Sequence, residues 1–161
     1  MTEVKLGMRV KDKITGFTGV VVTIESFLGR CDQAVVQPPI DKEGKVPDAV
    51  GIDVSRLEVT SKKQVIATEV PEPKYEYGQE VTDNISELKG KIIARAVHIS
   101  GCVQVALQPK HVEKREKLFQ GVWVPESQIT AVGKVLKKEV ERPRTGSVTR
   151  TQFQSNVGRS R

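Results

Sequence analysis

Short runs of apolar residues, many of them β-branched, are separated by Gly- and Pro-containing connections along residues 1–60. β-Branched residues favour strands over helices, and a strand buries alternate side chains. Residues 54–57 are too few for an α-helix, so they are predicted to form a single 3₁₀ turn. The strands predicted around this turn are residues 8–14, 20–27, 31–37, 49–53 and 58–60.

Most of this pattern occurs twice, at a constant offset of 71 residues, which indicates duplication of one small structural unit. Beyond the charged loop at residues 111–117, which is one residue longer than its counterpart, the offset becomes 72. Strands of the second unit are predicted at residues 80–85, 91–99, 102–108, 118–124 and 129–132. The identical pairs include Gly7/Gly78, Val10/Val81, Asp12/Asp83, Ile14/Ile85, Gly19/Gly90, Cys31/Cys102, Gln33/Gln104 and Gln37-Pro38/Gln108-Pro109.

We therefore expect an all-β protein with two tandem SH3-like five-stranded barrels, at residues 1–60 (the first copy) and 77–133 (the second copy). A 3₁₀ turn before the last of five short strands suits an SH3-like barrel, and an OB-like barrel is the alternative. The linker, residues 61–76, contains Pro71 and Pro73, which favour an extended path, and its residues 64–67 offer one more strand. Units this small bury only about 60% of their unfolded surface, so we expect the copies to pack on each other or on a partner.

The net charge of +6 is confined to the end of the chain. Residues 1–133 hold 18 Lys and Arg against 18 Asp and Glu, whereas residues 134–161 (the arm) hold 8 against 2. From Arg142 onward the arm is rich in Ser, Thr, Gln and Gly, so we expect it to be extended and ordered only against a partner. Its predicted partner contacts are Arg142, Arg144, Arg150, Phe153, Arg159 and Arg161.

Candidate chemistry is sparse. Cys31, Cys102, His98 and His111 are the only soft metal ligands, and none form the closely spaced pairs of a structural zinc site. No nucleophile elbow and no phosphate-binding glycine loop occurs. We therefore expect no enzyme activity, no metal and no cofactor. No apolar run approaches the roughly 18 residues of a membrane span, and residues 1–5 lack the apolar core of a signal peptide, so we expect no membrane partner.

Several residues are given structural roles instead. Asp12 and Asp83 are predicted to accept backbone hydrogen bonds in the turns that follow them. Cys31 and Cys102 are predicted to be small buried apolar residues. Tyr75 and Tyr77 are predicted to pack the linker against the copies. Core positions are predicted for the other aromatic residues of the two copies, Phe17, Phe27, Phe119 and Trp123.

Two resemblances bear on function. Residues 10–19 (VKDKITGFTG), with Cys31, Gln33 and residues 36–39 (VQPP), resemble a group of small, mostly uncharacterised proteins of tailed bacteriophages. That pattern ends in Trp-x-Asp-x-x-x-Leu; Gly51 replaces the Trp here, and the second copy keeps Trp123 but lacks the Asp. The resemblance covers about three quarters of the chain and not the arm. Residues 16–24 also resemble KOW-type SH3-like modules of ribosomal and transcription factors.

The phage resemblance implies a structural virion protein, assembled in the host cytoplasm, and no catalytic residues. We expect a capsid decoration or cement protein that docks on the major capsid protein or other virion subunits, with homo-oligomers as a further option. A head–tail connector or tail component is the nearest variant. The alternative is a module that binds nucleic acid or nucleoprotein through the basic arm.

Overall fold

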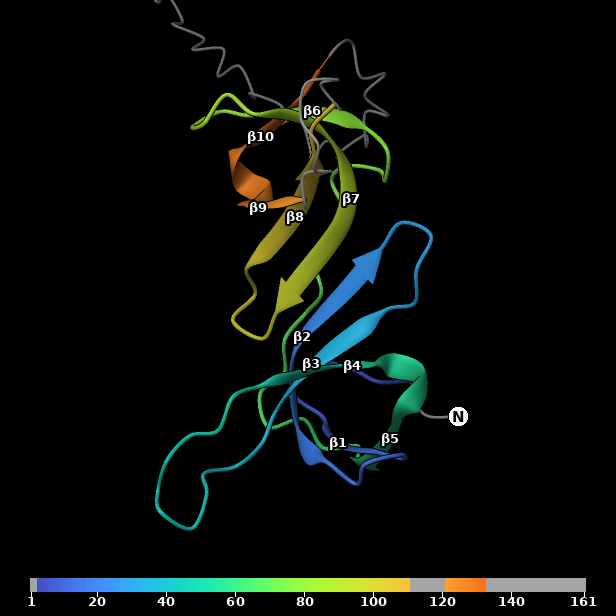
Figure 1. The fold of residues 1–161 in the computed structure, drawn as a ribbon, viewed down its shortest axis with the longest axis vertical. Helices are drawn as coiled ribbons and strands as arrows, with labels where there is room; N and C mark the ends of the chain where they lie inside the picture. Colours follow the sequence, from blue (N-terminus) through green and yellow to red (C-terminus); the bar gives the residue numbers. More distant parts are fainter. Residues whose placement is uncertain (1–2, 111–120, 133–161) are drawn as a thin grey trace, which may run out of the picture.

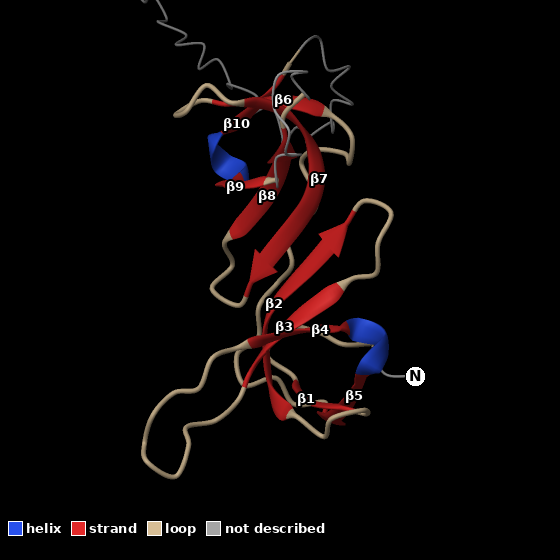
Figure 2. Cartoon of the chain, in the orientation of Figure 1, coloured by secondary structure: helices blue, strands red, loops and turns tan. Residues whose placement is uncertain are grey.

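The computed structural model describes residues 3–110 and 121–132. Over these residues the chain forms ten β-strands and two 3₁₀ turns, and all ten strands belong to one antiparallel sheet (Figure 1, Figure 2). The prediction of an all-β protein is confirmed. The predicted positions of the strands and of the 3₁₀ turn at residues 54–57 are also confirmed, with boundaries that shift by a few residues.

Both copies follow the same plan. In each, the first four strands pair with one another in sequence order. A 3₁₀ turn follows the fourth strand, and the fifth strand returns to pair with the first. The first copy contains β1 (Arg9–Asp12), β2 (Thr18–Phe27), β3 (Gln33–Gln37), β4 (Val50–Asp53), η1 (Val54–Arg56) and β5 (Leu57–Ser61). The second contains β6 (Glu80–Asp83), β7 (Lys89–His98), β8 (Val103–Gln108), β9 (Val122–Pro125), η2 (Glu126–Gln128) and β10 (Ile129–Ala131).

Some of the identical residues have a direct structural cause. Gly19 in β2 lies so close to the backbone of Gln37 in β3 that any Cβ would overlap the Gln37 carbonyl. Gly90 in β7 stands in the same relation to Gln108 in β8, where a Cβ would lie 2.9 Å from the carbonyl oxygen. Glycine is required wherever two backbones approach this closely. The matched glycines and glutamines of the sequence therefore mark one packing contact, made twice.

The long strands β2 and β7 join the two copies. β2 uses one edge for β3, and its other edge pairs first with β1 and then, through residues 23–27, with β7. Register shifts at residues 21–23 of β2 and 92–94 of β7 occupy equivalent places in the two copies. Such bulges bend a strand and increase its twist, so that one strand can serve two neighbours.

The expected closure of each copy into a separate barrel is not found among the described residues. β4 pairs only with β3 and β5 only with β1, so the two strands beside η1 leave the sheet open, and the same holds for β9 and β10. The β2–β7 ladder instead makes one continuous sheet of both copies. Residues 64–67 do not form the additional strand, although Val65 N–H donates to the Gly7 carbonyl at 2.8 Å.

Each copy contributes a cluster of buried apolar side chains. The clusters are not independent, because Val97 of the second copy packs with the first cluster. The first cluster contains Leu6, Val10, Val21, Ala34, Val36, Ile52, Leu57 and Val97. The second contains Val81, Ile92, Val105, Leu107, Val124 and Ile129.

Candidate interaction surfaces

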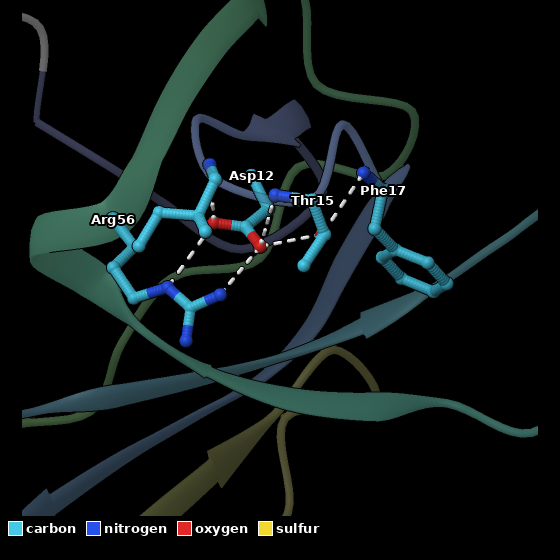
Figure 3. A network of polar contacts seen from close by, with 5 residues as sticks. Asp12, Thr15, Phe17 and Arg56 are labelled. Atoms are coloured by element: carbon cyan, nitrogen blue, oxygen red, sulfur yellow. Dashed lines mark hydrogen bonds and ion pairs between the residues drawn. The ribbon is translucent and has the colours of Figure 1, made fainter.

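Asp12 ends β1, and its carboxylate organises the turn that leads into β2 (Figure 3). Its Oδ2 accepts hydrogen bonds from the Thr15 hydroxyl at 2.6 Å and the Thr15 N–H at 3.2 Å, while Oδ1 accepts from the Ile14 N–H at 3.3 Å. The Thr15 hydroxyl oxygen accepts in turn from the Phe17 N–H at 3.2 Å. The predicted role of Asp12 as an acceptor for the following turn is confirmed.

Arg56, at the end of η1, completes this network. Its Nη2 donates to Asp12 Oδ2 at 2.6 Å and its Nε to Oδ1 at 3.2 Å, which makes a two-pronged ion pair (Figure 3). The Arg56 guanidinium, followed by the Thr15 hydroxyl, holds the pKa of the Asp12 carboxyl far below its ordinary value. The same contact raises the pKa of Arg56. A carboxylate that is 1% exposed therefore stays charged because every lone pair on it has a donor nearby.

The second copy repeats the turn without the arginine. Asp83 accepts from the Ser86 hydroxyl at 2.5 Å, from the Ser86 N–H at 3.1 Å and from the Ile85 N–H at 3.5 Å. Gln128 takes the place of Arg56, and its carbonyl accepts from the Asn84 N–H at 2.9 Å. The pKa of Asp83 is lowered chiefly by the Ser86 hydroxyl and N–H. The predicted role of Asp83 is confirmed, and the two turns differ in their charge balance.

An isoleucine stands on each of these turns and points away from both cores. Ile14 and Ile85 occupy equivalent positions, and each is 73% exposed. The backbone N–H of each donates to the carboxylate that organises its turn, so the backbone that carries the side chain is held in place. An exposed apolar residue on a backbone that is already ordered loses less conformational entropy when a partner covers it. The two isoleucines are therefore candidate docking points.

The linker crosses the β2–β7 ladder and contacts both copies. The Thr68 hydroxyl donates to the Ile99 carbonyl at 2.6 Å, and Arg95 Nη2 donates to the Pro71 carbonyl at 2.7 Å. The Tyr75 hydroxyl donates to the Ile129 carbonyl at 2.9 Å, and the Tyr77 hydroxyl to the Ser26 carbonyl at 3.2 Å. Tyr75 in the linker and Tyr77 directly after it therefore hold the linker against the copies, as predicted.

A cavity of about 200 Å³ lies between this linker and the ladder. Apolar and aromatic side chains make most of its wall, and Ser26 and Arg95 supply the polar part. Arg95 is 11% exposed and also pairs with the buried Glu126, with Nε and Oε1 3.4 Å apart. The complete lining is Ile24, Ser26, Val70, Pro73, Tyr75, Tyr77, Ile92, Arg95, Val97 and Val105.

On the ladder itself, His98 connects the two copies. Its Nδ1 lies 2.9 Å from the Thr23 hydroxyl of the first copy, and its Nε2 lies 3.2 Å from Gln104 Oε1 of the second. Glu25 lies two residues from Thr23 on the same strand, and burial raises the pKa of its carboxyl while the nearby His98 opposes the shift. The β2–β7 ladder thus holds two titratable side chains, Glu25 and His98, where the two copies meet.

Two sequence-based expectations about side-chain burial are wrong. Cys31 and Cys102 are exposed free thiols, because each precedes its strand in the connection that follows a turn, where no core side chains cover it. Trp123 is 39% exposed because its neighbour Val124 faces the core, which turns Trp123 to the other face of β9. Phe17 is half-buried against the first core. Phe119 and the predicted arm contacts Arg142, Arg144, Arg150, Phe153, Arg159 and Arg161 lie outside the described residues.

Residues 3–110 and 121–132 contain no cluster of three or more metal-ligating side chains. The helical turns of this part of the chain are also too short and too polar to cross a membrane. The exposed isoleucines were missed from the sequence, where they were assigned to strands whose alternate residues face the core. The sequence signal that could have identified them is their conservation between the two copies, at equivalent positions two residues after Asp12 and Asp83. No protein-family model, curated protein or solved structure matches the chain.

Proposed function

We propose that the chain is a structural protein of a tailed-bacteriophage particle, a capsid decoration protein that docks on neighbouring capsid subunits. It acts through its surfaces and performs no reaction. The observation that carries the proposal is the repeated turn: Ile14 and Ile85 stand at equivalent positions in two copies of one fold unit and are equally exposed. A body with two equal docking points suits a partner that is itself repeated, as the subunits of a capsid are.

Multivalent attachment explains why such a body would keep both turns. Once one turn is bound, the second meets its site at an effective concentration in the millimolar range, so two weak contacts give tight overall binding. The resemblance of residues 10–19 and 31–39 to tailed-phage proteins supports the particle as the place of attachment. We also propose that each copy is an open SH3-like unit, on the strength of its strand order and its 3₁₀ turn.

The test is quantitative mass spectrometry of purified phage particles. We expect the chain at a fixed ratio to the major capsid protein, because decoration proteins occupy equivalent sites on a lattice. A ratio corresponding to one ring of subunits would instead place it at the head–tail connector or tail. If washed particles lack the chain, the proposed function is wrong.

A further inference from the structure

The cavity at the junction arises where the two copies depart from their symmetry. On one side of the β2–β7 ladder, Val97 fills space in the first core. Its equivalent on the other side is Ser26, which is smaller and polar and lines the cavity next to Ile92 and Val105 of the second core. Protein interiors are close-packed, and unfilled apolar space is destabilising. The cavity is open to solvent beside Val70 and Tyr77, which are 54% and 42% exposed, so an occupant can enter it and cover this apolar surface.

The size of the cavity limits that occupant. Sites for cofactors and drug-sized ligands usually measure about 300–1,000 Å³, whereas an apolar cavity of about 150 Å³ is enough for benzene. A volume of about 200 Å³ matches one six-membered ring with a few further atoms. Such small pockets are also where partner proteins insert the single aromatic residue that dominates an interface.

Arg95 adds a preference for an oxygen acceptor on that ring. Its Nε is directed to Glu126 and its Nη2 to the Pro71 carbonyl, while its other Nη has no hydrogen-bond partner among residues 3–110 and 121–132. Because Glu126 already balances the charge of Arg95, an anionic ligand would leave one buried negative charge unpaired. A neutral phenol oxygen accepts the free N–H without that cost.

We propose that the junction cavity is an anchor pocket for one tyrosine side chain of a protein partner. The ring lies between the linker and the β2–β7 ladder, among Val70, Tyr75 and Val105, and its hydroxyl oxygen accepts from Arg95. The partner in question is the particle subunit of the proposed function, on which this inference rests for its biological setting. The pocket itself is a physical property of the chain and is tested without the particle.

The experiment is a titration of the full chain, labelled with nitrogen-15, with N-acetyl-tyrosinamide as the probe. We expect saturable shifts of the amide signals of Ser26, Val70, Tyr77 and Arg95, with a Kd of about 1 mM, which is realistic for a single small group. N-acetyl-phenylalaninamide should bind more weakly because it lacks the oxygen, and N-acetyl-alaninamide should not bind.

Two matched variants connect binding to the cavity. Val70 and Val65 are linker valines of nearly equal exposure, 54% and 55%, but only Val70 lines the cavity. Val70→Phe should weaken binding by about tenfold or more because it fills the space, whereas Val65→Phe should not change it. Ser26→Leu fills the cavity from β2 and provides a second block if Val70→Phe does not fold.

The pocket is refuted if the tyrosine probe causes no saturable shifts at the cavity, if alanine and tyrosine probes bind equally, or if Val65→Phe weakens binding as much as both cavity variants. These outcomes are separate from the test of the proposed function. Particles that lack the chain would remove the capsid role and leave a pocket that binds the probe. Particles that contain the chain, together with a silent titration, would remove the pocket alone.

Discussion

Glu25 of β2 and Ala96 of β7 lie opposite each other in the antiparallel ladder, and they are the same position of the two copies. The ladder is therefore symmetric about this pair: Thr23 pairs with His98 on one side and Phe27 with Ala94 on the other. Equivalent hydrogen bonds flank it, from Leu28 N–H to the Ile93 carbonyl and from Ile99 N–H to the Val22 carbonyl, both at 2.8 Å. The two copies thus meet as the subunits of a twofold dimer do, within one chain.

Replacing Glu25 should remove a pH dependence from this junction. Burial raises the pKa of Glu25 in the folded protein above the ordinary 4.5, so the wild type loses stability as the pH rises from about 4.5 through the folded pKa. Glu25→Gln should be more stable than the wild type at pH 7, and the difference should vanish near pH 4. Urea unfolding at several pH values checks this, and a constant difference across the range would contradict it.

The two carboxylate turns should respond differently to the same substitution. Asp12→Asn should lower the thermal midpoint more than Asp83→Asn, because only Asp12 balances an arginine. Both pKa values are lowered in the folded state, so the stability that these groups contribute is present above pH 3.8 and is lost as the pH falls further toward their folded pKa values. Thermal unfolding between pH 2 and 7 measures both effects; equal midpoints for the two variants would refute the role of Arg56.

Glu87 is predicted to be a strained position. Its φ is 60°, in the left-handed region, whereas the equivalent residue of the first copy is Gly16, with φ at 76°. A side chain costs about 1–2 kcal/mol in this region, and part of the gain from glycine is offset by its freedom in the unfolded chain. Glu87→Gly should therefore stabilise the protein by roughly 0.5–1 kcal/mol in chemical unfolding. Gly16→Ala is the reverse test and should be destabilising.

The two exposed isoleucines should act as a pair in binding. Ile14→Asp and Ile85→Asp should leave the fold unchanged, since each side chain is 73% exposed. Either change should reduce co-sedimentation with phage particles, by up to about 10²–10⁴-fold if avidity is lost completely, and the double variant should not bind. Val46→Asp is the control, because Val46 is 69% exposed but lies in a loop outside the two carboxylate turns. Full binding by the double variant would exclude these turns as docking points.

Salt dependence separates the particle role from nucleic-acid binding by the arm. If five or six of the arm's basic residues contact phosphates, the slope of log K against log salt should be about −5 for duplex DNA. We expect no such binding by the chain truncated after residue 133, whose Lys and Arg equal its Asp and Glu in number. Strong, salt-dependent binding by that truncated chain would place the nucleic-acid contact on the body instead.

The strand plan was predictable because local features and the repeat agreed. Glycine at positions 19 and 90, with Gln-Pro after the third strand, fixed the same hairpin in both copies. Asp12 and Asp83 were correctly assigned to their turns because an aspartate bonds to nearby backbone N–H groups in a way that depends only on local sequence. These elements needed no knowledge of distant contacts.

The pairing of β2 with β7 could not be predicted. Its residues, such as Ile24 and Val97, have the same β-branched character as those of any core strand. The local sequence does not indicate which edge of β2 or β7 is left unpaired within its own copy. Closure into separate barrels was therefore the natural expectation. The junction cavity could not be predicted from that expectation, because residues of both copies and the linker line it. The role of Arg95 could not be predicted either, because its partners, Glu126 of η2 and the Pro71 carbonyl of the linker, lie far from it in the sequence.

The ladder also sets an order of events during synthesis. The partner of β2 is encoded 71 residues later, which at translation rates of about 5–20 residues per second means a delay of roughly 4–14 s. Throughout that interval the nascent first half carries an unpaired strand edge that invites foreign strands. During synthesis, the first copy is therefore exposed to aggregation through the free edge of β2. This exposure ends when β7 emerges from the ribosome and pairs with that edge.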